Sequence, residues 1–236
     1  MPPPLARSSS GPESADLSDL IAKAVPRAHS ETHRILARTA RIRSALPNDV
    51  IYSQGEPIPL TLAMRGYGSF RRTTSEGRQL VLGLATRGDL FGFSAISSRN
   101  SPVDLLAVTE GEFALWSGQE VRALAADDPG LAFDIIDGLT RFIVDITYRF
   151  DGFIHQDARQ RVLRVLARHA DLFFGPSAIL SRSHLPSLVG TSREMTGRVI
   201  RDLEREGVVA RVGRSELRLL SPARLSAATD SHGASD

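Results

Sequence analysis

The chain has 236 residues, of which 42% are hydrophobic and 24% charged, with a formal net charge of +2 and no cysteine. This length suffices for two modest domains, and the lack of cysteine excludes disulfides, thiolate zinc sites and Cys-ligated iron–sulfur clusters. No apolar run approaches the roughly 20 residues of a membrane span, and residues 1–16 lack the apolar region of a signal peptide. We therefore expect a cytoplasmic protein with no membrane partner.

The composition and the predicted secondary structure of the N-terminal half change along the chain. Residues 1–16 are rich in Pro and Ser and are expected to form a disordered tail. Two short helical patterns, broken near Pro26, occupy residues 17–43. Short apolar or alternating runs separated by turn signals then indicate a β sandwich or barrel over residues 46–116. These runs lie at residues 50–52, 60–64, 79–84, 105–108 and 113–116.

A long helix is predicted over residues 128–155, because Pro129 can open a helix and apolar residues then recur at steps of three and four. This periodicity is typical of a coiled-coil seam and equally of a helix packed on its own β domain. The helix could therefore pair with a second copy of the chain, pack on its own domain, or do both. If the seam holds a dimer, Ile135 and Leu139 are expected to lie in it. The recurring residues are Ala132, Ile135, Ile136, Leu139, Phe142, Ile143, Ile146, Phe150 and Phe153.

Residues 185–207 are the most informative segment, because they indicate two short helices joined by a turn at Gly190, the layout of a DNA-reading helix-turn-helix. Pro186 is tolerated in the first helix only if that helix starts late, with Ser183 as its cap. Ser192 is a good N-cap for the second helix. At about 100° per residue the second helix separates a charged face from an apolar one. The charged face holds Arg193, Glu194, Gly197, Arg198 and Arg201, and the apolar face Met195, Thr196, Val199, Ile200 and Leu203.

These residue types suit the major groove, since Arg can bond two acceptors of guanine and Glu can accept from the cytosine amino group. Gly207 can end the helix as a left-handed cap, and strands at 208–212 and 216–220 around Gly213 and Arg214 predict a wing. Residues 158–224 hold 13 Arg against 6 acidic residues, whereas residues 1–157 are net acidic. The positive charge therefore lies where phosphate neutralisation requires it. A charged face that is merely solvated would not predict the turn, the cap and the hairpin together.

Taken in this order, the chain resembles the superfamily of the cyclic-AMP receptor protein and the fumarate–nitrate regulator from about Leu36 to Leu225. The resemblance rests on residues 46–57, 77–79, 86–92, 157–161, 189–198, 203–207 and 213–214. It implies an α+β protein with an N-terminal β-roll sensor like a cyclic-nucleotide-binding domain, a long dimerisation helix and a C-terminal winged helix-turn-helix. The implied domains are a tail at 1–16, the sensor with its flanking helices at 17–127, the dimerisation helix at 128–155, the winged helix-turn-helix at 156–225 and a tail at 226–236.

The resemblance further implies a bacterial transcription regulator that acts as a homodimer. In the family, the positions of Arg193, Glu194 and Arg198 read base edges. The Arg-Glu-x-x-Gly-Arg motif that contains them implies a palindromic operator with GTGA-like half-sites. Double-stranded DNA, a second copy of the chain and RNA polymerase are the implied partners. No enzyme is expected, because HExxH, GxSxG and Walker A patterns are absent. The candidate DNA-binding residues are Arg182, Thr191, Ser192, Arg193, Glu194, Gly197, Arg198, Arg201 and Arg214.

The sensor half departs from the family pattern. The family has Gly-Glu-Leu, whose Glu binds the ribose hydroxyl, and later Arg-Ser, whose Arg binds the phosphate. Here the first reads Gly92-Phe93-Ser94 and the second falls near Ser101-Pro102. We therefore expect an apolar or self-filled pocket, an unknown effector, and no binding of cyclic AMP in the usual mode. The candidate effector residues are Gly92, Phe93, Ser94, Arg99, Ser101 and Thr147, the last matching a ligand-facing position.

Two alternatives remain open. One is an effector-independent architectural DNA-binding protein with a vestigial sensor. The other is a haem- or metal-sensing regulator, for which His29 and His33 are four residues apart on a predicted helix. Because the chain has no Cys to complete a set of ligands, the pattern favours two solvated histidines over a metal site. His155 lies at the expected hinge, where a histidine could titrate near neutral pH, but a surface role is favoured.

Overall fold

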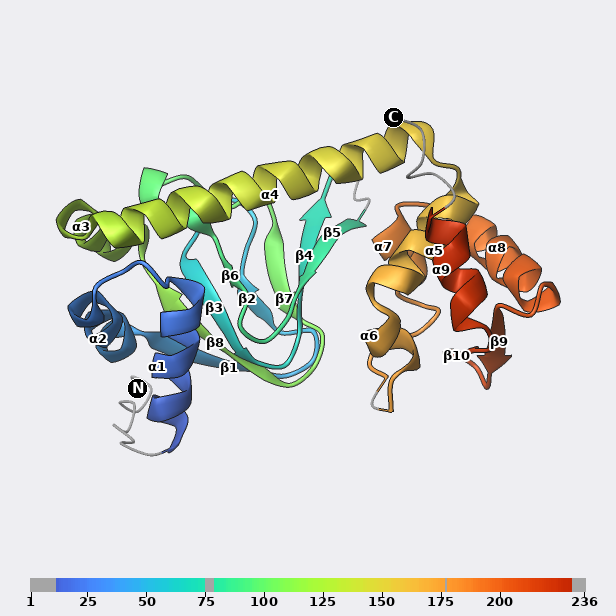
Figure 1. Cartoon of the computed structure of the whole chain (residues 1–236), viewed down its shortest axis with the longest axis horizontal. Helices are drawn as coiled ribbons and strands as arrows, with labels where there is room; N and C mark the ends of the chain where they lie inside the picture. The colour runs from blue at the N-terminus through green and yellow to red at the C-terminus, as the bar shows by residue number, and fades with distance from the viewer. Residues whose placement is uncertain (1–11, 75–78, 177, 231–236) are drawn as a thin grey trace, which may run out of the picture. The chain divides into compact units, whose positions relative to one another are not determined.

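The structure is a computed structural model that describes residues 12–74, 79–176 and 178–230. The chain divides into two units, one made of residues 1–70 and 84–143 and the other of residues 71–83 and 144–236. Helices and strands occur in both halves of the chain, so the predicted α+β class is confirmed (Figure 1). Among the described helices, none is long and apolar enough to span a bilayer.

The N-terminal part is a β-roll of two four-stranded sheets, ordered β1-β8-β3-β6 and β2-β7-β4-β5. Its short strands pair antiparallel, with Leu62 opposite Ala114 between the central strands of the first sheet. The elements are α1 (Pro12–Ala24), α2 (Ser30–Thr39), β1 (Arg41–Ala45), β2 (Val50–Tyr52), β3 (Leu60–Arg65), β4 (Gly68–Thr73), β5 (Gln79–Ala85), β6 (Leu90–Phe91), the 3-10 helix η1 (Phe93–Ser97), β7 (Asp104–Ala107), β8 (Gly111–Trp116), α3 (Gly118–Asp127) and α4 (Pro129–His155).

One hydrophobic core joins both sheets and the N-terminal helices. Leu62 and Phe113 from one sheet and Leu105 from the other are fully buried in it. Helix α1 adds Leu17, Leu20 and Ile21 to the same core. The indole of Trp116 donates to the carbonyl oxygen of Leu36 at 2.9 Å, which fastens α2 to the sheet.

Helix α4 packs on this core through one face of its N-terminal half. The carboxylate of Asp128 accepts from the backbone N–H of Gly130 at 2.9 Å and caps the helix start. Leu131 and Ile135 are buried, whereas Ile136 is 54% exposed. Leu139 also packs against the core of its own domain. The expectation that Ile135 lies in a dimer seam is therefore wrong, because the β-roll already covers it, whereas Leu139 is only partly buried.

The C-terminal elements pack around a second core. Asp157 and Gln160 form the capping box that starts α5. The elements are α5 (Ala158–Arg168), α6 (Ala170–Phe174), α7 (Leu185–Val189), α8 (Arg193–Arg205), β9 (Val209–Val212), β10 (Glu216–Leu219) and α9 (Pro222–Asp230). The core side chains are Val162, Leu163, Leu166, Phe173, Leu180, Leu185, Val189, Val199, Ile200, Leu203, Val208, Val209, Leu217 and Leu225.

Several predicted boundaries differ from those in the structure. Helix α1 begins at Pro12, inside the stretch expected to be a tail, because its apolar face is needed in the core. Strand β1 takes Arg43, which the helical pattern had included, and α9 extends past residue 225 into the expected second tail. Residues 1–11, the motif residues 77 and 78, and residues 231–236 lie outside the described residues.

Candidate DNA-reading surface and sensor site

Helix α8 is capped at both ends as the sequence predicts. The hydroxyl of Ser192 accepts from the backbone N–H of Met195 at 3.1 Å. At the other end Gly207 has φ +68°, and its N–H donates to the carbonyl of Glu204 while that of Val208 donates to the carbonyl of Leu203. This pair of bonds is a Schellman motif, which ends the helix and turns the chain into β9.

The two faces of α8 are separated. Thr196, Val199, Ile200 and Leu203 are buried, and the charged side chains opposite them are exposed. Met195 was placed with the apolar face but is 37% exposed, because it lies about 90° from the centre of the buried stripe. The exposed charged residues are Arg193, Glu194, Arg198 and Arg201, with Gly197 half-buried between them. On this face Arg198 and Glu194 form an ion pair at 3.7 Å.

Helix α7 starts late, as its proline requires. It begins at Leu185, so Pro186 lies in its first turn, where the missing N–H costs little. The cap position is His184 and not Ser183, as had been expected; the imidazole Nδ1 accepts from the backbone N–H of Ser181 at 3.0 Å. Gly190 ends the helix in the left-handed conformation with φ +68° and forms the turn into α8.

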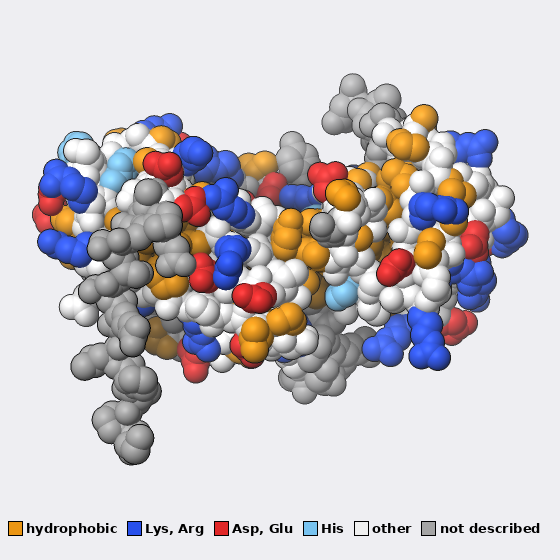
Figure 2. All heavy atoms as spheres, turned by 90° about the horizontal axis from the view of Figure 1, so that it is seen from below, with side chains coloured by type: hydrophobic (Ala, Val, Ile, Leu, Met, Phe, Trp, Pro, Cys, Tyr) orange, Lys and Arg blue, Asp and Glu red, His pale blue; other side chains and the backbone are white. Residues whose placement is uncertain are grey.

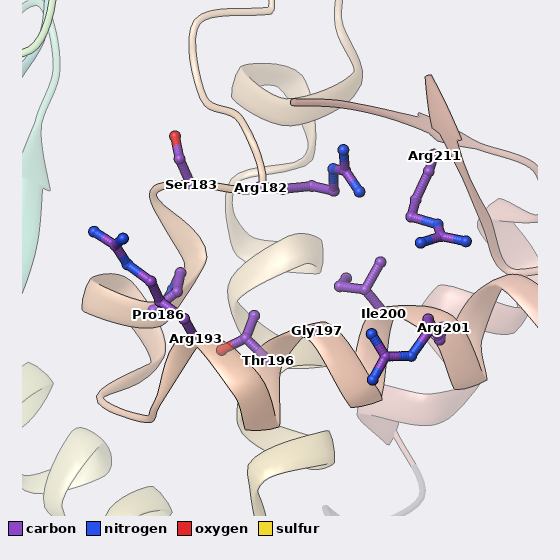
Figure 3. Close-up of a pocket in the computed structure, with 9 residues that line it drawn as sticks. All are labelled: Arg182, Ser183, Pro186, Arg193, Thr196, Gly197, Ile200, Arg201 and Arg211. Carbon is purple, nitrogen blue, oxygen red and sulfur yellow. The ribbon is translucent and has the colours of Figure 1, made fainter. Parts of the chain in front are cut away.

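A hollow of about 330 Å³ lies beside α8 and is lined by four arginines (Figure 3). Arg193 and Arg201 come from α8, Arg182 from the segment before α7 and Arg211 from β9. Figure 2 shows further arginine side chains on the surface of the C-terminal part. This concentration of positive charge can attract a polyanion such as the DNA backbone.

Two of these arginines bind the protein itself and hold the wing. Arg182 donates its backbone N–H to the carbonyl of Ser215 at 2.8 Å and its guanidinium to the carbonyls of Gly213 and Arg214. From α8, Glu204 accepts from the Nε of Arg211 at 2.7 Å and from its backbone N–H at 3.1 Å. The backbone N–H of Arg211, followed by its guanidinium, lowers the pKa of Glu204. The wing is thereby fixed relative to the reading face, with the Arg214 side chain exposed at its turn.

The candidate effector residues at 92–94 form a tight turn. Gly92 has φ +79°, and a Cβ there would lie 2.1 Å from the carbonyl oxygen of Pro59. The carbonyl of Ser94 accepts from the hydroxyl of Ser97. The ring of Phe93 lies against Gly138 of α4, where an added Cβ would approach Cζ to 2.2 Å. An aromatic ring thus occupies the space between this turn and the helix.

The remaining candidate effector residues differ in exposure and in hydrogen bonding. Ser101 is 3% exposed, and its hydroxyl donates to the carbonyl of Val103 at 2.6 Å. The Arg99 side chain is exposed, while its carbonyl accepts from the N–H of Ile58. Thr147 lies on α4 in the other unit and is exposed.

Sequence reasoning missed a polar cluster that ties the N-terminal helices to α4. Asp134, 4% exposed, accepts from the backbone N–H of Arg27 at 2.8 Å and from its guanidinium at 3.3 Å. Asp128 likewise accepts from the backbone N–H of His29 at 2.7 Å. His33 bonds through Nε2 to the carbonyl of Val25. The partners are about a hundred residues apart in the first two cases, so no local pattern could reveal them.

Comparison with known proteins adds the identity of both halves. A family model described as a cyclic nucleotide-binding domain matches residues 42–128, and one described as a Crp-like helix-turn-helix domain matches residues 160–228. The cyclic AMP receptor protein of Thermus thermophilus is 29% identical over 168 residues, 67% of this chain and 78% of that protein. The CRP-like protein Clp of Xanthomonas euvesicatoria is 29% identical over 196 residues, 77% of this chain and 85% of that protein.

Solved structures agree with the sequence relatives. The c-di-GMP responsive global regulator CLP of Xanthomonas campestris has a TM-score of 0.68 and 26% identity, covering 82% of this chain and all of that chain. A Crp/Fnr-family regulator of Eubacterium rectale, at 15% identity and a TM-score of 0.73, supports the fold alone. With both family models matched in order, the chain belongs to the superfamily of transcription regulators that includes the cyclic-AMP receptor protein and the fumarate–nitrate regulator.

Proposed function

We propose that this regulator reads a palindromic operator with GTGA-like half-sites, placing α8 of each protomer in the major groove. The observation that carries the proposal is the exposed face of a doubly capped α8, where Arg193, Glu194 and Arg198 are free of the core. Arg and Glu at the start of a recognition helix match the acceptors of guanine and the amino donor of cytosine. Thr191, Ser192, Gly197, Arg201 and Arg214 belong to the same proposed surface, with Arg182 assigned to holding the wing.

A palindrome requires two copies, and α4 offers a surface for the second. Phe133, Ile136 and Ile143 are exposed, and with Thr140 they follow one another at steps of three, four and three along the helix. This stripe has the spacing of a coiled-coil seam. It keeps Ile136 and Ile143 of the expected seam and leaves out Ile135 and Leu139. RNA polymerase, as a further partner of a DNA-bound regulator, belongs to the same proposal.

Binding-site selection from randomised duplexes tests this proposal. The purified protein should enrich a palindrome, and Arg198→Ala should lose about 1–3 kcal/mol on the selected site and relax preference at one base pair of each half-site. Arg205→Ala is the matched control, because Arg205 lies at the opposite end of α8 in an ion pair with Asp202. Enrichment of no sequence, or an unchanged profile for Arg198→Ala, would refute the assignment of the reading face.

Cyclic AMP bound in the usual mode is proposed not to be an effector of this chain. The names of the relatives point to cyclic nucleotides, since one is a cyclic AMP receptor, another is cAMP-activated and a third is c-di-GMP responsive. In this chain, Phe93 stands at the place of the family's ribose-binding Glu, and its ring lies on α4. Both cyclic AMP and cyclic di-GMP are therefore compounds to test and not assigned ligands.

A further inference from the structure

The ring of Phe93 packs directly against the backbone of Gly138 in α4. A Cβ at this position would lie 2.2, 2.4 and 2.6 Å from Cζ, Cε1 and Cε2 of the ring, closer than carbon atoms can approach. Glycine is unfavourable in a helix interior, because it loses more backbone freedom than any other residue. A glycine inside α4 therefore indicates that close approach of the ring to the helix backbone is needed there.

The turn that carries Phe93 is held from two sides. Gly92 approaches the carbonyl of Pro59 so closely that only glycine fits, and Gly118 at the start of α3 approaches the carbonyl of Ala95 in the same way. Arg122 of α3 donates its Nε to the carbonyl of Ile96 at 2.8 Å. Ala95 itself is fully buried. The backbone that carries the ring is therefore packed between Pro59, directly before β3, and the start of α3.

The same turn of α4 is held by the N-terminal helices. Arg27, which lies between α1 and α2, bonds through its guanidinium to Asp134 and Asp137, one turn apart on α4. Asp134 is almost fully buried, so this contact is part of the packed structure. Residues 134–138 of α4 are thus held by two side chains of the protein itself. Arg27 binds the carboxylates, and the ring of Phe93 packs against the backbone at Gly138.

We propose that Phe93 makes, as a permanent part of the protein, the contact between the sensor turn and α4 that a bound effector would otherwise supply, so that operator binding needs no small ligand. The inference rests on the proposed DNA-binding function. A ligand shifts an equilibrium only by its differential affinity for the two states. Because the contact with α4 is already made, a cyclic nucleotide can gain little from making it again.

The test uses the full chain, freed of nucleotide by refolding, and a duplex obtained by binding-site selection. Fluorescence anisotropy should give the same operator Kd, within about twofold, with and without millimolar cyclic AMP or cyclic di-GMP. Gly138→Leu and Phe93→Ala should each weaken operator binding at least tenfold. The double variant Phe93→Ala/Gly138→Leu should recover most of the affinity, since leucine fills the space that the ring leaves. Ala123→Leu, at an exposed position of α3, is the control for adding the same side chain elsewhere.

The outcomes separate the two proposals. Failure of the wild-type protein to bind any selected DNA would refute the proposed function. Binding of DNA only after a nucleotide is added, or wild-type affinity for both single variants, would overturn the role of Phe93 alone. If Gly138→Leu does not fold, as shown by its thermal transition, Phe93→Ala and the double variant still decide, because a structural defect predicts no recovery of affinity in the double variant.

Discussion

The stripe of exposed apolar residues on α4 allows a quantitative prediction for the dimer. In this stripe Phe133, Ile136 and Ile143 are 59%, 54% and 62% exposed, and the adjoining Val144 is 46% exposed. Together they leave about two side-chain equivalents of apolar surface in each protomer. At about 1.5–3 kcal/mol for each fully buried side chain, covering this surface in both protomers contributes roughly 6–13 kcal/mol before the cost of association. The stripe is therefore sufficient for a stable dimer only if most of it is covered.

Ile136→Asp combined with Ile143→Asp removes about half of that surface in each protomer and places four carboxylates along the seam. The lost burial alone is about 3–7 kcal/mol for the dimer, so its dissociation constant should rise at least 100-fold. Sedimentation equilibrium measures this change. Ile42→Asp is the matched control, because Ile42 is 47% exposed on β1 and lies outside α4. An unchanged dimer in the double variant, or dissociation caused by Ile42→Asp, would show that the protomers meet elsewhere.

Three further outcomes are expected. Arg214→Ala, at the exposed wing turn, should weaken binding to all duplexes alike and reduce the slope of log K against log salt by about one unit in a titration. For Asp128, burial alone would raise the pKa, but hydrogen bonds from Thr32 and from backbone N–H groups lower it. Its contribution to stability is therefore present above the ordinary Asp pKa and lost as pH falls through the lowered value; Asp128→Asn should reduce Tm at pH 7 and not near pH 2. Calorimetry with cyclic AMP should show no Kd tighter than about 100 μM, or roughly −5.5 kcal/mol.

The winged helix-turn-helix could be predicted almost completely, because its determinants are local. The Ser192 cap, the turn at Gly190 and the stop at Gly207 each act within a few residues, and the structure has all three. The face of α4 that packs on the β-roll could not be assigned for the opposite reason. Ile135 and Ile136 are equally apolar, and only the β-roll, distant in sequence, decides that the first is buried and the second exposed.

Contacts between distant segments account for what the sequence left undetermined. Phe93 and Gly138 are far apart in the chain, and nothing local to either indicates the other. The pair formed by Arg27 and Asp134 spans 107 residues. Strand β1 was missed because it forms by pairing with β8, as Arg43 opposite Phe113 illustrates, and not from its own pattern. Periodicity therefore reveals that a face is apolar, but packing decides which partner covers it.

The chemistry of the sensor residues is the reason why we expect no binding of cyclic AMP in the usual mode. A cyclic nucleotide brings a permanent negative charge, and burying that phosphate without a cationic partner is costly because the ion loses its hydration. Ser101 lies near the place of the family's phosphate-binding Arg. It is buried, and its hydroxyl donates to the carbonyl of Val103. Arg99 is exposed and would have to move to serve instead. Low-micromolar binding of cyclic AMP that Arg99→Ala abolishes would contradict this reasoning and identify Arg99 as the phosphate ligand. Without such binding, the apolar contact between Phe93 and Gly138 accounts for how the turn and α4 stay together.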